Sequence, residues 1–293
     1  RSFHVTGVQT CALPISENDP LYAEKLLGLG GALARAMLEG DWNAIEGAYF
    51  DTFDKEKHII EYINVPNDWH KIRAFDWGYS KPFCVLWGAV SDGSLVNCGG
   101  IKRSFPRGAI IIYREFYGCT GKPNEGLKIG VGEIAKTIKE LQMGEKMIEM
   151  RADPAIFDVS SGQSIANQFE SHNIGWLPAD NHRVAGWQQI RARLAGNEDD
   201  QPLLYITKNC RNLLRTLPLM QYDKSKPEDL DTDMEDHAVD TLRYLCMTKP
   251  ITPREIKKPL TIEESAKKQL EIQRLIDNIK KENELLTKKK KQI

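Results

Sequence analysis

Short apolar runs alternate with amphipathic segments from residue 71 to residue 250, which is the pattern of an α/β domain. The apolar runs predict strands at residues 72–75, 83–90, 109–117, 147–152 and 174–177, with a short extra strand at 203–206. Between the second and third runs, Ser91-Asp-Gly-Ser94 has the composition of a hairpin turn leading to Leu95 and Val96. We therefore predict a five-stranded sheet.

Helical periodicity fills the gaps between these runs. Ile134, Ile138 and Leu141 share one face of a helix that precedes the fourth strand. Further helices are predicted at residues 163–171, 184–195, 208–219 and 233–247. Helices that alternate with strands in this way should flank the sheet.

The N-terminal part has a different character. Residues 5–15 resemble the conceptual translation of a common sequencing adapter, so residues 1–16 are predicted to be an artefact, with a natural disordered N-terminus as the alternative. Residues 17–70 are predicted to be a connector. Its aromatic residues have no clear period, and we expect them to pack onto a neighbour: Trp42, Tyr49, Phe50 and Phe53.

The C-terminal part, residues 251–293, is predicted to be a charged helical tail. Thr261-Ile-Glu-Glu264 has the form of a capping box, and the helix after it would end in Lys288 to Lys291. The apolar positions Ile272, Ile276 and Ile279 have heptad-like spacing over a short distance. A solvated tail and a partner-docking segment both remain open.

Composition excludes several classes of protein. The hydrophobic content of 41% is ordinary for a protein with a core, and no apolar stretch approaches the roughly 20 residues of a membrane helix. The six cysteines include no CxxC pair or ligand spacing, so neither a zinc site nor a disulfide framework is supported. We expect a soluble protein in a reducing, cytoplasmic setting. The formal net charge of −1 means that any basic surface is local.

Carboxylates mark the candidate site. Asp76 and Asp153 each end a predicted strand, and strand ends that meet at one sheet edge are the usual place for an α/β active site. Alone, either residue would more often begin a turn, and the combination carries the hypothesis. The third cluster, Asp236-His237-Ala-Val-Asp240, lies in a predicted helix, where this spacing puts His237 or Asp236 on one face with Asp240. Its alternative is an acidic helix start that complements the helix dipole.

These side chains predict a metal centre. Hard carboxylates without a nearby cysteine favour two Mg²⁺ or Mn²⁺ ions, which together hydrolyse phosphodiesters through an activated water. We expect Asp76, Asp153 and Asp240 to be ligands, and which of His237 and Asp236 assists is left open.

Basic side chains outside the acidic cluster are candidates for contact with DNA phosphates. Each is equally plausible as ordinary solvated surface. The candidates are Lys102, Arg103, Arg107, Arg183, Arg191, Arg193, Lys208 and Arg211, with Arg215 nearby.

A family resemblance rests on two phrases, Asp236-His-Ala-Val-Asp240-Thr-Leu-Arg-Tyr244 and Asp76-Trp-Gly-Tyr79. With them, residues 33–247 resemble the C-terminal nuclease region of tailed-phage terminase large subunits. The resemblance implies a ribonuclease H-like mixed sheet, whose second strand is antiparallel to the rest, and metal-dependent cleavage of concatemeric viral DNA during packaging. It also implies double-stranded DNA, the portal protein and the terminase small subunit as partners, in the host cytoplasm and without a membrane.

One departure from that family concerns its ATPase half. The chain has no Gly-x-x-x-x-Gly-Lys-Ser/Thr loop, and Gly28-Leu-Gly-Gly31 lacks both the lysine and a preceding strand. We therefore expect residues 17–70 to be a connector from a missing ATPase domain, in a truncated gene product. Two alternatives remain: another ribonuclease H-like nuclease such as a junction resolvase, expected to be a homodimer that prefers branched DNA, and a non-catalytic DNA-binding or docking module.

Overall fold

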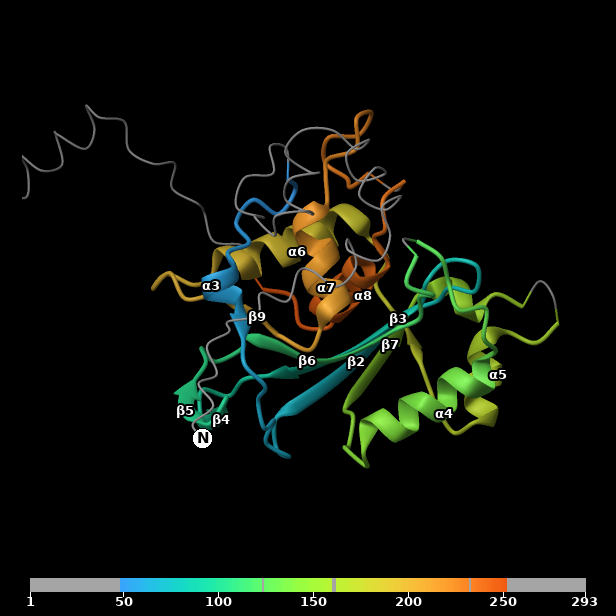
Figure 1. The fold of residues 1–293 in the computed structure, drawn as a ribbon, viewed down its shortest axis with the longest axis horizontal. Coiled ribbons are helices and arrows are strands. Elements are labelled where there is room, and N and C mark those ends of the chain that lie inside the picture. Colours follow the sequence, from blue (N-terminus) through green and yellow to red (C-terminus); the bar gives the residue numbers. More distant parts are fainter. Residues whose placement is uncertain (1–47, 123, 160–161, 232, 252–293) are drawn as a thin grey trace, which may run out of the picture. The chain divides into compact units, whose positions relative to one another are not determined.

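A seven-stranded sheet lies at the centre of the computed structural model, which describes residues 48–251 apart from 123, 160–161 and 232 (Figure 1). Its strand order is β1-β9-β6-β3-β2-β7-β8. The predicted artefact at residues 1–16, residues 17–47 of the predicted connector and the predicted tail from residue 252 onward lie outside the described residues.

The strands follow the predicted apolar runs closely in the middle of the sheet. β3 is antiparallel to β2 and to β6, and the other neighbouring pairs are parallel. The predicted mixed sheet with an antiparallel second strand is therefore confirmed. The bounds are β1 Ile59–Ile60, β2 His70–Asp76, β3 Cys84–Val90, β6 Ile110–Tyr117, β7 Glu149–Ala152, β8 Leu177–Pro178 and β9 Leu204–Thr207.

Two details of the predicted sheet are wrong. The sheet has seven strands instead of five, because the short β1 and β9 pair beside β6 and extend it. The turn at residues 91–94 does not fold the next strand back onto β3. Instead β4 (Leu95–Cys98) pairs with β5 (Ile101–Ser104) in a separate two-stranded sheet, and β3 finds its second partner in β6.

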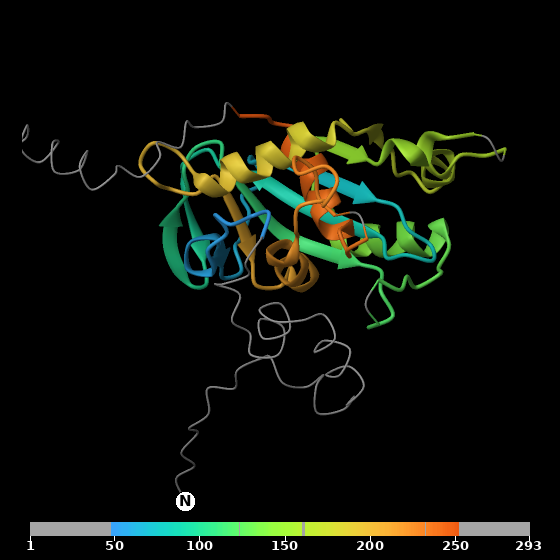
Figure 2. The ribbon, with the colours of Figure 1, turned by 90° about the horizontal axis from the view of Figure 1, so that it is seen from above.

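Helices cover both faces of the large sheet (Figures 1 and 2). On one face, α6, α7 and α8 enclose a core that contains Trp187, Leu213 and Leu242. On the other face, α4 and α5 enclose a second core with Ile134 and Phe169. The helices are α3 Lys55–His58, α4 Val131–Gln142, α5 Ile165–Ser171, α6 Arg183–Ala195, α7 Arg211–Thr216 and α8 His237–Met247, with 3-10 turns η1 Pro154–Phe157 and η2 Leu217–Leu219.

The described end of the predicted connector packs into this domain. Tyr49 and Phe50 are buried in the core under α6, and the ring of Phe50 lies edge-on to Trp187 at 6.4 Å between centroids. These aromatic residues were expected to pack onto a neighbour, and for Tyr49 and Phe50 that neighbour is the sheet domain itself. Whether residues 17–70 connect to a further domain stays a prediction.

Alternation along β2 decides which side chains reach which face. Ile72 and Ala74 point into the core under α8, whereas Phe75 points into the core under α4 and α5. Arg73 shares the side of Phe75, since its guanidinium lies over Trp176 of that second core. Asp76 consequently faces α8 from the end of the strand.

Two other features of the described residues concern disulfide bonds and membrane-spanning helices. The five cysteines of the described part are free thiols. Within residues 48–251, leaving aside the four undescribed positions, no helix has the length and apolarity needed to cross a bilayer.

Candidate metal centre at the sheet edge

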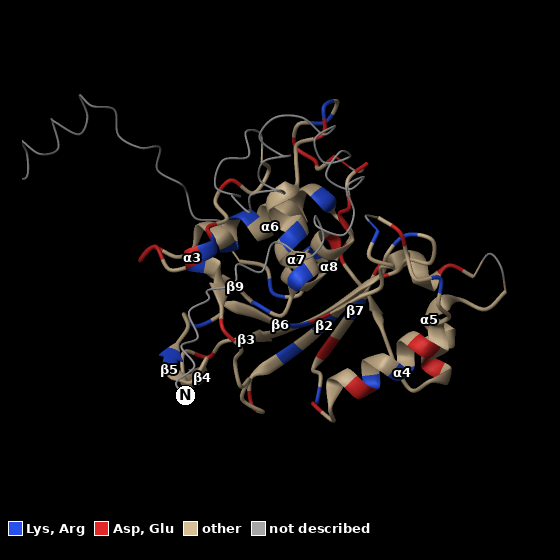
Figure 3. Ribbon diagram, viewed as in Figure 1, with Lys and Arg blue, Asp and Glu red and all other residues tan. Residues whose placement is uncertain are grey.

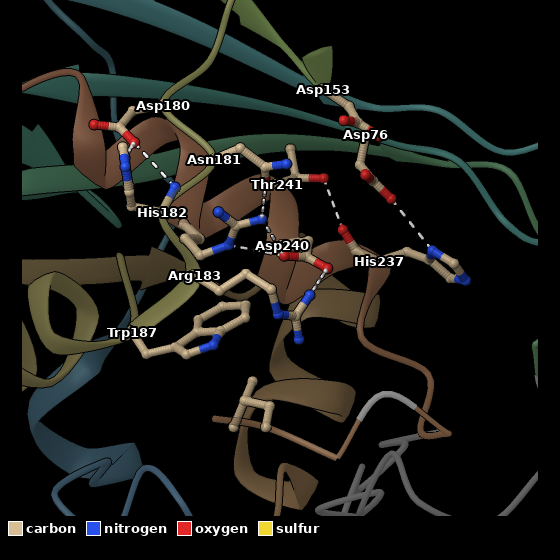
Figure 4. Close-up of polar contacts among 12 residues, drawn as sticks. Asp76, Asp153, Asp180, Asn181, His182, Arg183, Trp187, His237, Asp240 and Thr241 are labelled. Atoms are coloured by element: carbon tan, nitrogen blue, oxygen red, sulfur yellow. Dashed lines mark hydrogen bonds and ion pairs between the residues drawn. The ribbon is translucent and has the colours of Figure 1, made fainter. Parts of the chain in front are cut away.

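Asp76 and Asp153 lie at neighbouring strand ends. β2 and β7 are parallel with Phe75 paired to Ala152, and the amide of Asp153 donates to the carbonyl of Phe75 at 2.9 Å. Both residues therefore leave the sheet at one edge, side by side, as Figure 4 shows. This confirms the expected juxtaposition of the two strand ends.

Helix α8 brings the third cluster to the same place. It is buried along nearly its whole length and packs against β2 and β3. Gly88 of β3 permits this approach, because a Cβ there would lie only 2.9 Å from the methyl groups of Leu245. Asp236 occupies the N-cap position and His237 is the first helical residue. The helix was predicted to start at residue 233, but residues 233–235 are not helical.

The imidazole of His237 is held between two oxygens. Its Nδ1 lies 3.2 Å from Oδ2 of Asp76 (Figure 4). Its Nε2 lies 3.1 Å from the side-chain oxygen of Asn124. The Thr241 hydroxyl donates to the carbonyl of His237 at 2.8 Å and fixes the first turn of the helix. His237 and Asp76 thus form the closest contact between α8 and the strand-end acids.

The pKa values of two acids at this edge, Asp76 and Asp236, are raised. Burial, together with the charges of Asp240 and Asp153, raises the pKa of Asp76 to about 7, although the hydrogen bond from His237 acts in the opposite direction. Burial and the charge of Asp240 raise the pKa of Asp236 to about 6. Burial would lower the pKa of His237, but its hydrogen bond to Asp76 and the surrounding carboxylates outweigh this and raise it.

Asp240 turns away from Asp76 toward two arginines (Figure 4). Its Oδ1 accepts from Nε and Nη2 of Arg243 at 2.8 and 2.6 Å, and its Oδ2 lies 3.5 Å from Nη1 of Arg183. Arg243 is only 1% exposed and stacks against Trp187 and Tyr244. Both carboxylate oxygens of Asp240 are therefore engaged by protein cations.

The donor set fits a hard divalent cation in its chemistry. Asp76 and Asp236 are carboxylates in a buried position with raised pKa values, and a divalent cation bound among them would offset their charge. Their spacing is not that of a closed site, because no three His, Cys, Asp or Glu side chains of the described residues are close enough together to hold a metal ion. Asp153 instead accepts from the amide of Ala155 at 3.1 Å, capping its own 3-10 turn.

The predicted DNA-contacting residues differ in exposure. Figure 3 shows that Lys and Arg positions occur on many elements of the fold. Lys102, Arg103, Arg107 and Arg211 are exposed. Lys208 is also exposed but pairs with Glu61. These five remain candidates for phosphate contact.

The three arginines of α6 are engaged within the protein. Arg183 binds Asp229 and Asp240, and Arg191 pairs with Asp51. The prediction for Arg193 is wrong, since this residue is 0% exposed and donates to the carbonyls of Gly108 and Lys249. Helix α6 turns Arg193 toward the sheet, and the guanidinium is therefore bound by backbone carbonyls inside the protein. Nearby in α7, Arg215 is bound by Glu235.

Three residues of the site were not predicted from the sequence. Asn124 holds His237 from a loop more than a hundred residues away, and Asn181 accepts from Arg243 at 3.1 Å. Neither has a local signal, because its role depends on tertiary contact. Arg243 did have one, since it lies three residues after Asp240 on the same helical face.

No family model and no curated protein matches the chain. The large terminase of a thermophilic bacteriophage, in complex with ADP, matches at a TM-score of 0.52 and 15% identity, over 78% of this chain and 51% of that one. A second crystal form of the same large terminase matches at 0.51 and 16%, over 78% and 51%. The nuclease domain of the P22 large terminase matches at 0.49 and 12%, over 73% and 98%.

The likeness to the two crystal forms of the thermophilic phage enzyme shows the fold. The chain spans about half the length of that large terminase. The ribonuclease H-like fold class expected from the sequence, with its mixed sheet and flanking helices, is confirmed.

Proposed function

We propose that the domain is a divalent-metal-dependent DNA endonuclease that acts as the nuclease part of a phage terminase large subunit. The observation that carries the proposal is the meeting of Asp76, Asp153 and His237 at one sheet edge. It occurs in a fold that the chain shares with a phage large terminase. This function would be the cutting of concatemeric viral DNA during genome packaging, in the host cytoplasm.

The residues proposed to hold Mg²⁺ or Mn²⁺ are Asp76 and Asp153, with His237 or Asp236 completing the set. Two such ions would lower the pKa of a bound water and offset charge on the phosphate that it attacks. The amide of Ala155 donates to Oδ1 of Asp153, so the second carboxylate oxygen could bind a cation without loss of this hydrogen bond. To act as a ligand, His237 would have to free one ring nitrogen from its contact with Asp76 or with Asn124.

Asp240 is proposed to position the site. As a metal ligand it would have to offer Oδ2, which lies 3.5 Å from Nη1 of Arg183, because Oδ1 accepts from both Nε and Nη2 of Arg243. As a positioning residue it ties the first turn of α8 to Arg183 of α6. That tie keeps His237 and Asp236 over the strand ends.

DNA is the proposed substrate, because exposed cations lie outside the acidic edge. Lys102 and Arg103 are on β5, and Arg107 follows it. Contacts from such residues to phosphates would be independent of sequence and sensitive to salt. The portal protein and the terminase small subunit are proposed partners from the family resemblance.

Plasmid cleavage by the full chain tests the function. Supercoiled DNA is incubated with Mn²⁺, Mg²⁺ or EDTA, using the wild type, Asp76→Asn and Asp153→Asn. We expect nicking only with a divalent metal, and a loss of at least about a hundredfold in each variant, since each removes a carboxylate proposed to hold the metal. Asp199→Asn, an exposed acid in a distant loop, is the matched control and should cleave normally.

Two results would contradict the proposal. One is cleavage that Asp76→Asn leaves unchanged. The other is a folded wild-type chain that binds Mn²⁺ and DNA but does not cut with any metal, which is the behaviour of a non-catalytic binding module.

A further inference from the structure

A cavity of about 310 Å³ opens beside β7, between the end of α4 and the loop after α5. Arg73 and Gln142 are among its lining residues, with Lys139 and Lys146 near them. Arg73 points to the α4 side of the sheet, whereas Asp76 on the same strand faces α8. The cavity is therefore separate from the candidate metal centre.

Arg73 is a buried cation without an acidic partner. It is 2% exposed, and none of the ion pairs among the described residues involves it. Its Nη1 donates to the side-chain oxygen of Gln142 and its Nη2 to the sulfur of Met150, while Nε has no partner. Stacking over Trp176 at 4.5 Å gives partial compensation only.

The one acid of the cavity is already occupied. Glu145 accepts from the Tyr113 hydroxyl at 2.7 Å and from Arg114 at 2.8 Å. Burial lowers the pKa of Arg73 to about 10, which still leaves the guanidinium charged at neutral pH. A charge held in this way is costly unless an anion or water approaches it.

Two lysines add to this charge at the mouth of the cavity. Lys139 lies in the last turn of α4, and Lys146 lies in the loop that leads to β7. Both are exposed, and neither forms an ion pair within the part of the chain that the structure describes. The cavity wall thus combines one buried and two exposed cations with a single acid that is bound elsewhere.

We propose that this cavity binds a phosphate group, as inorganic phosphate or as a phosphomonoester. A phosphate dianion offers several acceptor oxygens, which suits a planar guanidinium together with two ammonium groups better than a monovalent carboxylate does. The volume is large enough for a ligand the size of a nucleotide. The proposal stands independently of the nuclease function, because it uses none of the residues at the metal centre.

Calorimetric titration of the full chain tests the site. Inorganic phosphate, deoxyadenosine monophosphate, deoxyadenosine and acetate are titrated separately at matched ionic strength, in buffer stripped of divalent cations. We expect saturable binding of the two phosphate compounds only. Tighter binding of the monophosphate would identify a phosphomonoester site, and equal binding would identify a site for the phosphate group alone.

Variants of the exposed lysines avoid any effect on folding. Lys139→Gln and Lys146→Gln should each weaken phosphate binding about three- to tenfold, because each removes one charged donor. Lys136→Gln, an exposed lysine of the same helix that does not line the cavity, should leave binding unchanged. The proposal is overturned if neither phosphate compound binds, if acetate binds equally well, or if all three variants behave like the wild type.

Discussion

Replacing Asp76 by asparagine should stabilise the metal-free protein. Asp76 is 7% exposed, and burial with the charges of Asp240 and Asp153 raises its pKa from 3.8 to about 7. The folded protein therefore holds this proton up to about pH 7, whereas the unfolded chain loses it near 3.8. Stability is lost as the pH rises through this window, because folding must then return a charge to a repulsive site.

The magnitude follows from that window. One pKa unit corresponds to about 1.4 kcal/mol, so ionised Asp76 costs the fold about 4 kcal/mol at pH 8 and less than about 2 kcal/mol at pH 5. Asparagine keeps an oxygen that can accept from His237 but carries no charge. The variant should exceed the wild type in unfolding free energy by about 2–4 kcal/mol at pH 8, and by much less at pH 5.

Urea denaturation followed by tryptophan fluorescence measures this difference. Both proteins are unfolded at pH 5 and pH 8 in metal-free buffer, with Asp199→Asn as the control that should match the wild type. Adding Mn²⁺ at pH 8 should then stabilise the wild type more than the variant, since only the wild type keeps the full ligand set. A variant that is no more stable than the wild type at pH 8 would refute the electrostatic reasoning.

Three further results are expected. Asp240→Asn should lower the unfolding free energy by roughly 3 kcal/mol in chemical denaturation, because it leaves the guanidinium of Arg243 buried without its carboxylate; a neutral effect would argue against the positioning role. Gly186→Ala should cost roughly 1–3 kcal/mol, since its Cβ would lie 2.3 Å from Cγ of Arg243, whereas Gly130→Ala has open space and should be tolerated. Lys102→Gln should make the slope of the logarithm of the DNA-binding constant against the logarithm of salt concentration shallower by about one, which corresponds to one phosphate contact. An unchanged slope would exclude Lys102 from the DNA interface.

Much of the fold could be predicted because its strands carry strong local signals. The apolar runs that became β2, β3 and β6 are seven or eight residues long and mostly buried, whereas β7 has four residues, of which only the last is buried. β1 could not be predicted, because two residues carry no period. β8 is two residues long and lies later than predicted, since Trp176 before it stacks on Phe75 and packs as part of a loop.

The candidate site was predictable where acids end strands and less so where partners are remote. Asp76 and Asp153 follow from strand ends, and His237 from helical spacing. The arginines that engage Asp240 come from α6 and from one turn further along α8. Charge type alone does not show which acid is bound by a protein cation and which is left for a metal.

The most direct test of the central claim is a Mn²⁺ titration of the full chain in which metal binding and plasmid cleavage are measured on the same samples. Binding is measured by the loss of the free-ion electron paramagnetic resonance signal. The account predicts that cleavage rises with occupancy of the site that Asp76→Asn removes, and that no cleavage remains in that variant at any metal concentration. Cleavage that persists in Asp76→Asn, or that rises independently of this site, would contradict it.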